Sequence, residues 1–271
     1  MNRFDDLFSQ RGRKAFVPFF TLGDPDWETS REIIVSAVQA GADALELGYP
    51  FADPISDGPT NQKSMARALR AGATFDGCTR LVTAIRQRFP DLPISLLLYY
   101  NLLFFQEDAG YRKLADAGVD AVVISDLPFE ESRRHVDSLH GHGIGCVHMV
   151  APNTPLDRAR VLFDQSRAFT YVISRFGTTG ADRQLSPDTL QRARVLRTIT
   201  EKPYIVGFGI SHPEMVRQVW DTGADGVIVG SHFISMIERN TAEIAPAIRG
   251  ICSFIEDVKS PAPAPPHQAA S

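Results

Sequence analysis

Short, unbroken apolar runs alternate with amphipathic stretches along most of the chain. Unbroken apolar runs are typical of strands buried on both faces of a parallel sheet, and apolar positions three and four residues apart indicate helices. The pattern predicts strands at 16–22, 44–47, 94–100, 121–125, 145–150, 169–174, 204–208 and 226–229. It predicts helices at 3–10, 29–41, 62–89 with a break at 71–72, 111–117, 130–139, 157–163, 190–199, 212–221 and 242–258.

One short segment recurs where a predicted helix gives way to a strand. It reads AGADAL at 40–45, AGVDAV at 117–122 and TGADGV at 222–227. Each copy is a helix end, a glycine suited to the C-terminal cap, a small residue, an aspartate and the start of a strand. Eight such strand–helix units in a chain of this size predict a single (β/α)8 barrel domain over residues 1–259, which includes a short N-terminal helix.

A doubly wound nucleotide-binding fold is the main alternative. It requires about six strands and a glycine fingerprint near the N-terminus, and the sequence has no such fingerprint. The segment GFGISH at 207–212 lacks the third glycine of a dinucleotide site. The barrel is therefore the predicted fold.

Composition narrows the function classes. Of the 271 residues 44% are hydrophobic and 22% charged, with a net charge of −4 and no dense basic run, which disfavours nucleic acid as a partner. No apolar stretch approaches the ~18 residues that span a bilayer, and the N-terminus lacks a signal-peptide core. Three scattered cysteines are typical of a reducing compartment, so we expect a cytoplasmic protein. The Pro/Ala-rich tail at 260–271 is expected to be flexible.

Two carboxylates stand out after the second predicted strand. Glu46 is a lone acid in an apolar strand, and Asp57 follows in a loop rich in glycine and proline. An acid at a strand end beside an acid on a loop suits an acid–base pair, whereas a single strand acid is more often simply ion-paired. In a barrel both acids lie at the C-terminal ends of the strands, where active sites are found.

Three glycine-rich segments follow the sixth, seventh and eighth predicted strands, at 177–180, 207–209 and 230–231. Glycines allow backbone N–H groups to approach an anion, and a helix that begins at Gly230-Ser231 directs its positive end toward it. We therefore expect a phosphate site at this corner. His140, His142 and His148 have no matching carboxylate, so no metal site is predicted.

Several of these segments resemble the tryptophan synthase α subunit family, over nearly the whole chain apart from the tail. The resemblance rests on FVPFFTLGDP (16–25), LELGYPFADPISDGPTNQ (45–62), LLLYYN (96–101), SDLPFEES (125–132), TYVISRFGTTGA (170–181), GFGIS (207–211) and VGS (229–231). It implies retro-aldol cleavage of indole-3-glycerol phosphate to indole and glyceraldehyde 3-phosphate. It implies no metal or organic cofactor in this chain, since the family's pyridoxal phosphate belongs to the β subunit that receives the indole.

The resemblance also implies roles for individual residues. Glu46 would exchange protons, Asp57 would accept the indole N–H, and Tyr171 would assist. The remaining expected residues are Gly180, Gly209, Gly230 and Ser231 for the phosphate, and Phe19, Leu97, Thr179 and Phe208 for the indole pocket.

A β subunit is expected to dock over the barrel mouth in an α2β2 complex, against Pro50, Asp53 and Asn101. The sequence departs from the family pattern at Tyr49, beside Glu46, and at Asn61, where an aliphatic residue is usual. Two alternatives follow: a stand-alone lyase that releases indole, and a non-catalytic subunit that binds a phosphorylated ligand.

Overall fold

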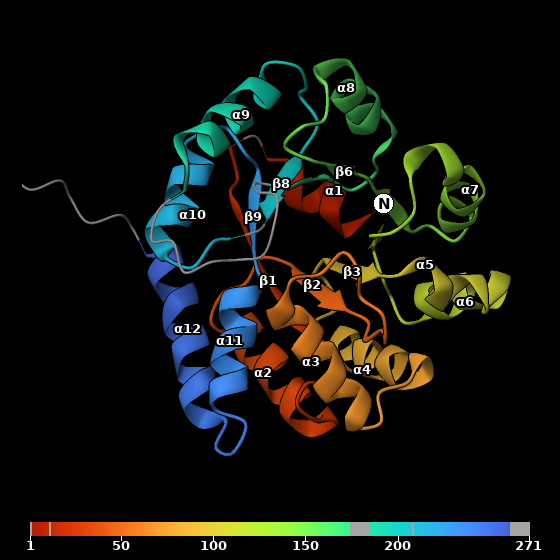
Figure 1. Cartoon of the computed structure of the whole chain (residues 1–271), viewed down its shortest axis with the longest axis vertical. Helices are drawn as coiled ribbons and strands as arrows, with labels where there is room; N and C mark the ends of the chain where they lie inside the picture. The colour runs from red at the N-terminus through yellow and green to blue at the C-terminus, as the bar shows by residue number, and fades with distance from the viewer. Residues whose placement is uncertain (1, 11, 174–184, 208, 261–271) are drawn as a thin grey trace, which may run out of the picture.

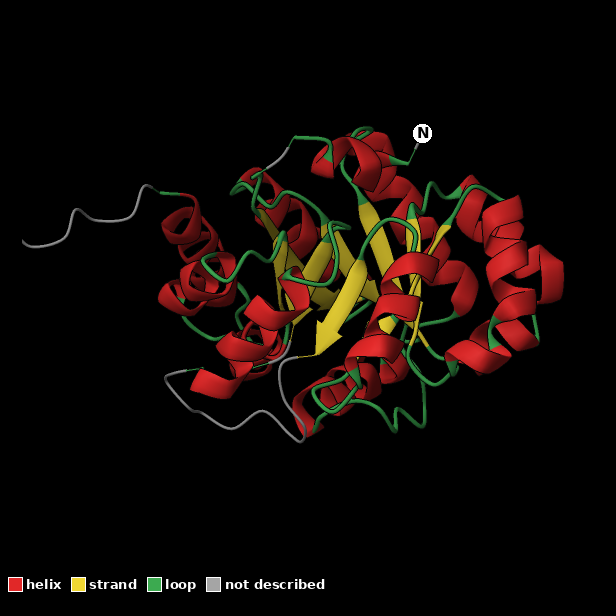
Figure 2. Cartoon of the chain, turned by 90° about the horizontal axis from the view of Figure 1, so that it is seen from above, coloured by secondary structure: helices red, strands yellow, loops and turns green. Residues whose placement is uncertain are grey.

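Parallel strands form one sheet that curves into a barrel with helices outside it (Figures 1 and 2). The computed structural model describes residues 2–10, 12–173, 185–207 and 209–260. Its strands are β1 (Ala15–Thr21), β2 (Leu45–Gly48), β3 (Ile94–Leu98), β4 (Ala121–Ile124), β5 (Gly145–Val147), β6 (Met149–Val150), β7 (Thr170–Ile173), β8 (Tyr204–Gly207) and β9 (Gly226–Val229). The sheet order is β5-β4-β3-β2-β1-β9-β8-β7-β6, and every pair is parallel.

The fifth predicted strand is divided at His148 into β5 and β6, and these two short strands complete the barrel. β5 pairs with β4 on one side, and β6 pairs with β7 on the other. At the junction the His148 N–H donates to the Ser166 hydroxyl at 3.2 Å, while the His148 carbonyl accepts from the Tyr171 N–H at 3.0 Å. The two halves of the sheet therefore meet around His148, and the predicted (β/α)8 fold is confirmed.

Helices surround the barrel, and the short α1 lies at the N-terminal ends of the strands (Figure 1). Phe4 on α1 is fully buried, with its ring 5.1 Å from that of Phe169. The helices are α1 (Arg3–Phe8), α2 (Trp27–Gln39), α3 (Pro59–Arg70), α4 (Phe75–Arg88), α5 (Tyr100–Phe104), α6 (Glu107–Asp116), α7 (Arg133–Gly141), α8 (Leu156–Gln165), α9 (Pro187–Arg197), α10 (Pro213–Trp220), α11 (Ser231–Arg239) and α12 (Ala245–Lys259). A 3-10 turn, η1, spans Phe129–Glu131.

The three recurring joints share a geometry that the sequence alone does not reveal. In each, the aspartate before a strand accepts a backbone N–H from the preceding strand in the chain. The pairs are Asp43 with Phe16 (2.7 Å), Asp120 with Ile94 (2.8 Å) and Asp225 with Tyr204 (2.9 Å).

Each of these aspartates also contacts a cation. Lys259 lies 2.6 Å from Asp43, Arg86 lies 2.7 Å from Asp120, and Arg197 lies 2.6 Å from Asp225. A charge-assisted hydrogen bond combined with a backbone hydrogen bond fixes the spacing of neighbouring strands. The repeated aspartates therefore serve the fold, at the barrel end opposite the predicted site.

Some predicted boundaries are wrong. β3 ends at Leu98, and Tyr100 begins the helix α5, which was not predicted; the Tyr100 N–H donates to Asp126 Oδ1 at 2.7 Å. The helical region from 62 to 89 is two helices with a break at 71–74, close to the predicted position, and α3 begins at Pro59. The Pro/Ala-rich tail lies outside the described residues, apart from Ser260.

Candidate active site

Glu46 is the buried acid of the site. It lies in β2, opposite Phe19 of β1 and Ser95 of β3, and is 1% exposed. Among the described residues, its Oε1 atom has no hydrogen-bond partner. Burial, and then the nearby Asp57 carboxylate, raise the pKa of Glu46 to about 8. Glu46 can therefore hold a proton at neutral pH and also release it.

Asp57, in the loop before α3, has both carboxylate oxygens engaged by neutral donors. The Tyr99 hydroxyl donates to Oδ2 at 2.7 Å, and the Asn61 amide donates to Oδ1 at 2.9 Å. Burial raises the pKa of Asp57, whereas these two hydrogen bonds lower it. The two acids therefore differ in their surroundings, which is how one site can hold a proton donor and an ionised carboxylate together.

Tyr171 lies in β7 and is buried. Burial, and then the charges of Glu46 and Asp57, raise its pKa well above the ordinary value, so the hydroxyl keeps its proton. Gly207 at the end of β8 makes room for it, because any side chain there would overlap the Tyr171 hydroxyl. The structure thus brings together the three residues predicted for catalysis.

Phe19 links this acid pair to the glycine-rich corner. Its ring is 3% exposed and fills the space that side chains at Gly48 and Gly230 would take. A Cβ atom at Gly48 would lie 2.7 Å from the ring, and one at Gly230 would lie 3.0 Å from it. Leu97, half-buried in β3, lies opposite Gly48 of β2. Two of the four residues predicted for the indole pocket, Phe19 and Leu97, therefore lie on the strands next to β2, which carries Glu46.

At the predicted phosphate corner, Gly230 caps α11 and Ser231 is the first residue of that helix. The first N–H groups of a helix have no partner within it and attract anions. Gly209 has a φ of 77°, a conformation that favours glycine. Thr179, Gly180 and Phe208 lie outside the described residues.

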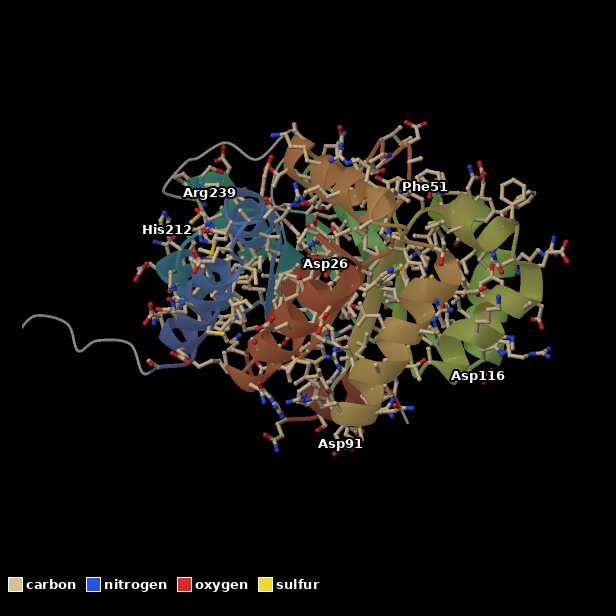
Figure 3. The ribbon with its side chains drawn as sticks, turned by 90° about the horizontal axis from the view of Figure 1, so that it is seen from below. Asp26, Phe51, Asp91, Asp116, His212 and Arg239 are labelled. Carbon is tan, nitrogen blue, oxygen red and sulfur yellow. The ribbon has the colours of Figure 1, made fainter. Side chains whose placement is uncertain are left out.

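The residues predicted to face a partner differ in exposure. Asp53 and Asn101 are exposed, whereas Pro50 is buried and presents no surface. Phe51, which is labelled in Figure 3, stacks on Tyr99, and the ring centroids lie 4.9 Å apart at an interplanar angle of 17°. Three large apolar side chains are exposed in the same loop and in α5 and its C-terminal cap: Ile55 (74%), Phe104 (53%) and Phe105 (79%).

Two neighbours of Asp57 were not predicted as site residues, and one apparent neighbour of Glu46 lies elsewhere. Tyr99 and Asn61 both contact the Asp57 carboxylate. Tyr49, by contrast, turns toward α4: its hydroxyl lies 3.0 Å from the Thr79 hydroxyl and its ring contacts Phe75. Side chains alternate along a strand, which puts positions 46 and 49 on opposite faces and was a usable signal.

Within the described ranges, no group of three or more His, Cys, Asp or Glu side chains could hold a metal ion. No helix of the described chain is long and apolar enough to cross a membrane.

Taken together, the fold and the site define a class of protein: a (β/α)8 barrel with an acid pair of unlike surroundings at the C-terminal ends of its strands. Comparison with known families identifies the family within this class, because residues 6–261 match the family described as "Tryptophan synthase alpha chain". The chain belongs to this family, whose members are lyases.

Individual relatives agree over nearly their full lengths. The chain is 40% identical to the tryptophan synthase alpha chain of Serratia proteamaculans, over 96% of this chain and 98% of the relative. It is 43% identical to that of Methanothermobacter thermautotrophicus, over 88% of each. Among solved structures, the chain is similar to one from Pyrococcus furiosus that concerns mutual activation of the tryptophan synthase α2β2 complex. The TM-score is 0.83 at 32% identity, and the match covers 90% of this chain and 97% of that one.

Proposed function

We propose that this chain cleaves indole-3-glycerol phosphate to indole and glyceraldehyde 3-phosphate, as the α subunit of a tryptophan synthase. The observation that carries the proposal is the buried Glu46 carboxyl, which has a pKa near 8 and lies beside the hydrogen-bonded Asp57 carboxylate. Family membership supports the same reaction.

The reaction breaks the bond between indole C3 and the glycerol side chain. It requires a proton delivered to C3, a proton removed from the adjacent side-chain hydroxyl, and stabilisation of the positive charge that develops on the ring nitrogen. Glu46 supplies the first two steps, since its pKa of about 8 lets both of its forms exist near neutral pH. Asp57 accepts the ring N–H and stabilises the charge. Tyr171, whose hydroxyl keeps its proton, would assist beside Glu46.

The phosphate of the substrate is assigned to the corner formed by Gly209, Gly230 and Ser231. The backbone N–H groups at the start of α11 and the Ser231 hydroxyl are the donors there. Phe19 touches this corner through Gly230 and touches β2 through Gly48. One ring therefore fixes the distance between the acid that acts on the indole and the donors that hold the phosphate.

A direct assay tests the reaction. Purified protein is incubated with indole-3-glycerol phosphate, and indole and glyceraldehyde 3-phosphate are both measured, with Glu46→Gln as the matched inactive control. Equal amounts of the two products from the wild type, and none above background from the variant, are the expected result. A wild type that binds glyceraldehyde 3-phosphate but releases no indole, with or without a β subunit, would instead favour a non-catalytic subunit.

A β subunit is the proposed partner, and it would carry the pyridoxal phosphate. Ile55 exposes apolar surface in the loop that bears Asp57, and Phe104 and Phe105 expose apolar surface at the C-terminal end of α5. Exposed aromatic and aliphatic side chains of this kind are typical of interfaces. Because Phe51 of this loop stacks on Tyr99, which holds Asp57, contact at the surface can act on the site.

Titration with a β subunit tests the docking surface. Activation by about tenfold or more, a coupling of about 1.4 kcal/mol, is expected for the wild type. Ile55→Asp and Phe105→Asp should each weaken it, whereas Val161→Asp, which alters an exposed apolar residue on α8, should not. Pro50 is unsuitable for this test because it is buried. Full activity of the isolated chain and no complex by mass would favour a stand-alone lyase.

A further inference from the structure

Asp57 is held by side chains from two different elements. Tyr99, which follows β3, donates a hydrogen bond to one carboxylate oxygen, and Asn61, in the first turn of α3, donates to the other. The Gln62 amide donates to the Asp57 backbone carbonyl at 2.8 Å. The carboxylate therefore has little freedom to rotate.

Asn61 itself is poorly accommodated by the fold. Its Oδ1 atom is buried and, among the described residues, has no hydrogen-bond partner. A buried carbonyl without a partner costs free energy that an apolar side chain of similar size would not. Packing and stability therefore do not account for an asparagine at this position, whereas the contact with Asp57 does.

The described residues offer Asp57 neutral donors and no cation. No lysine, arginine or histidine among them forms an ion pair with it. The titratable groups facing it are Glu46 from β2, Tyr99 after β3 and Tyr171 from β7. Burial disfavours the charged form of Asp57, and the hydrogen bonds from Tyr99 and Asn61 are what offset this cost.

We propose that Asn61 is a positioning residue for Asp57, fixing that carboxylate in the orientation in which it accepts the ring N–H of the substrate. The inference rests on the proposed function and adds to it a residue specific to this chain. Asn61 acts through Asp57, so its effect falls on the chemical step and its pH dependence. Binding of the phosphate, at the α11 end of the site, is independent of it.

The test is the pH dependence of kcat in Asn61→Leu, which keeps the approximate volume and removes the amide. Without this hydrogen bond the pKa of Asp57 rises, so the acidic limb of the profile moves to higher pH. We expect kcat to fall about threefold or more at the acidic end, with the loss shrinking as pH increases and the KM changing less than about twofold. Asn61→Ala, which is smaller, should shift the limb in the same direction. Gln62→Leu removes only the backbone contact and should leave the limb in place.

A second measurement does not depend on activity. The carboxyl 13C resonance of Asp57 should titrate at higher pH in Asn61→Leu than in the wild type. An active wild type whose acidic limb and Asp57 titration are both unchanged in Asn61→Leu and Asn61→Ala would overturn the inference. An inactive wild type would instead refute the proposed reaction, and the 13C titration would still decide whether Asn61 controls Asp57.

Discussion

The two ends of the barrel use acidic residues in opposite ways. At the N-terminal strand ends, Asp43, Asp120 and Asp225 each accept a backbone N–H and contact a cation. At the C-terminal ends, Glu46 and Asp57 form no ion pair with the described residues, and burial raises the pKa of both.

The difference shows what separates a structural acid from a reactive one. A carboxylate beside a cation is stabilised in its charged form and has little tendency to take up a proton. A carboxylate that is buried without a cation is less stable when charged, and its proton becomes available for chemistry. The fold is therefore stabilised at one end and destabilised at the other, where the reaction is proposed.

The largest expected effect comes from replacing Glu46, the acid that carries the proton at the C-terminal ends of the strands. Glu46→Gln keeps the size of the side chain and abolishes proton exchange, so transition-state stabilisation should fall by at least ~3 kcal/mol, with substrate binding nearly unchanged. Steady-state indole formation measures this loss. More than about a tenth of wild-type turnover in the variant would show that Glu46 is not the proton donor.

At the N-terminal strand ends, replacing an aspartate should lower the stability of the fold and leave the rate of the reaction unchanged. Asp120→Ala removes the acceptor of the Ile94 N–H and leaves the half-buried Arg86 without its carboxylate, so the free energy of unfolding should fall by about 2–4 kcal/mol. Urea unfolding measures it, with kcat at 25 °C as the second readout. Asp116→Ala, an exposed aspartate (Figure 3), is the control and should stay within about 0.5 kcal/mol. An equal loss in both variants would contradict the structural role.

A smaller effect is expected when a negative charge is added at the proposed phosphate site. Ser231→Asp places a carboxylate at the start of α11, which suits the helix but repels a phosphate, so KM should rise about tenfold or more with the fold intact. Ser231→Ala should raise KM less, because it removes one donor and adds no charge. Unchanged affinity for glyceraldehyde 3-phosphate in Ser231→Asp would move the phosphate to another part of the barrel.

The smallest effect concerns the pH dependence of stability. Between the ordinary pKa of 4.5 and about 8, unfolded Glu46 has lost its proton while folded Glu46 keeps it, so wild-type stability falls as pH rises through this window. Glu46→Gln removes this dependence. Relative to wild type, the variant should gain about 1 kcal/mol between pH 5 and pH 6 in urea unfolding. Parallel pH profiles for the two proteins would show that the pKa of Glu46 is not raised.

The sequence was sufficient for the fold because its signals are local. The Gly-x-Asp joints mark helix ends and strand starts, and the apolar runs give the strands of a parallel sheet. It could not show which N–H or cation each aspartate meets, because those partners lie far away in the chain, as Lys259 does from Asp43.

For the same reason, the sequence predicts some residues of the site and misses others. Glu46 and Asp57 stand out by residue type in an apolar strand and a turn-rich loop. In the sequence Asn61 is only a departure from the family pattern, since its role depends on the direction of one side chain toward Asp57. Tyr49 is close to Glu46 in sequence, but its hydroxyl contacts Thr79 of α4, on the other face of the strand.

The split strand at His148 has a mechanical consequence. Elsewhere each strand is hydrogen-bonded to a neighbour on both sides, but at this residue the N–H turns to Ser166 and only the carbonyl continues the sheet, to Tyr171. We therefore expect the barrel to open more readily at His148 than between its other strands. Because the Tyr171 N–H bonds to the His148 carbonyl, such opening would also affect a residue of the site. Amide hydrogen exchange at Tyr171 that is faster than at the centres of the other strands is the expected signature.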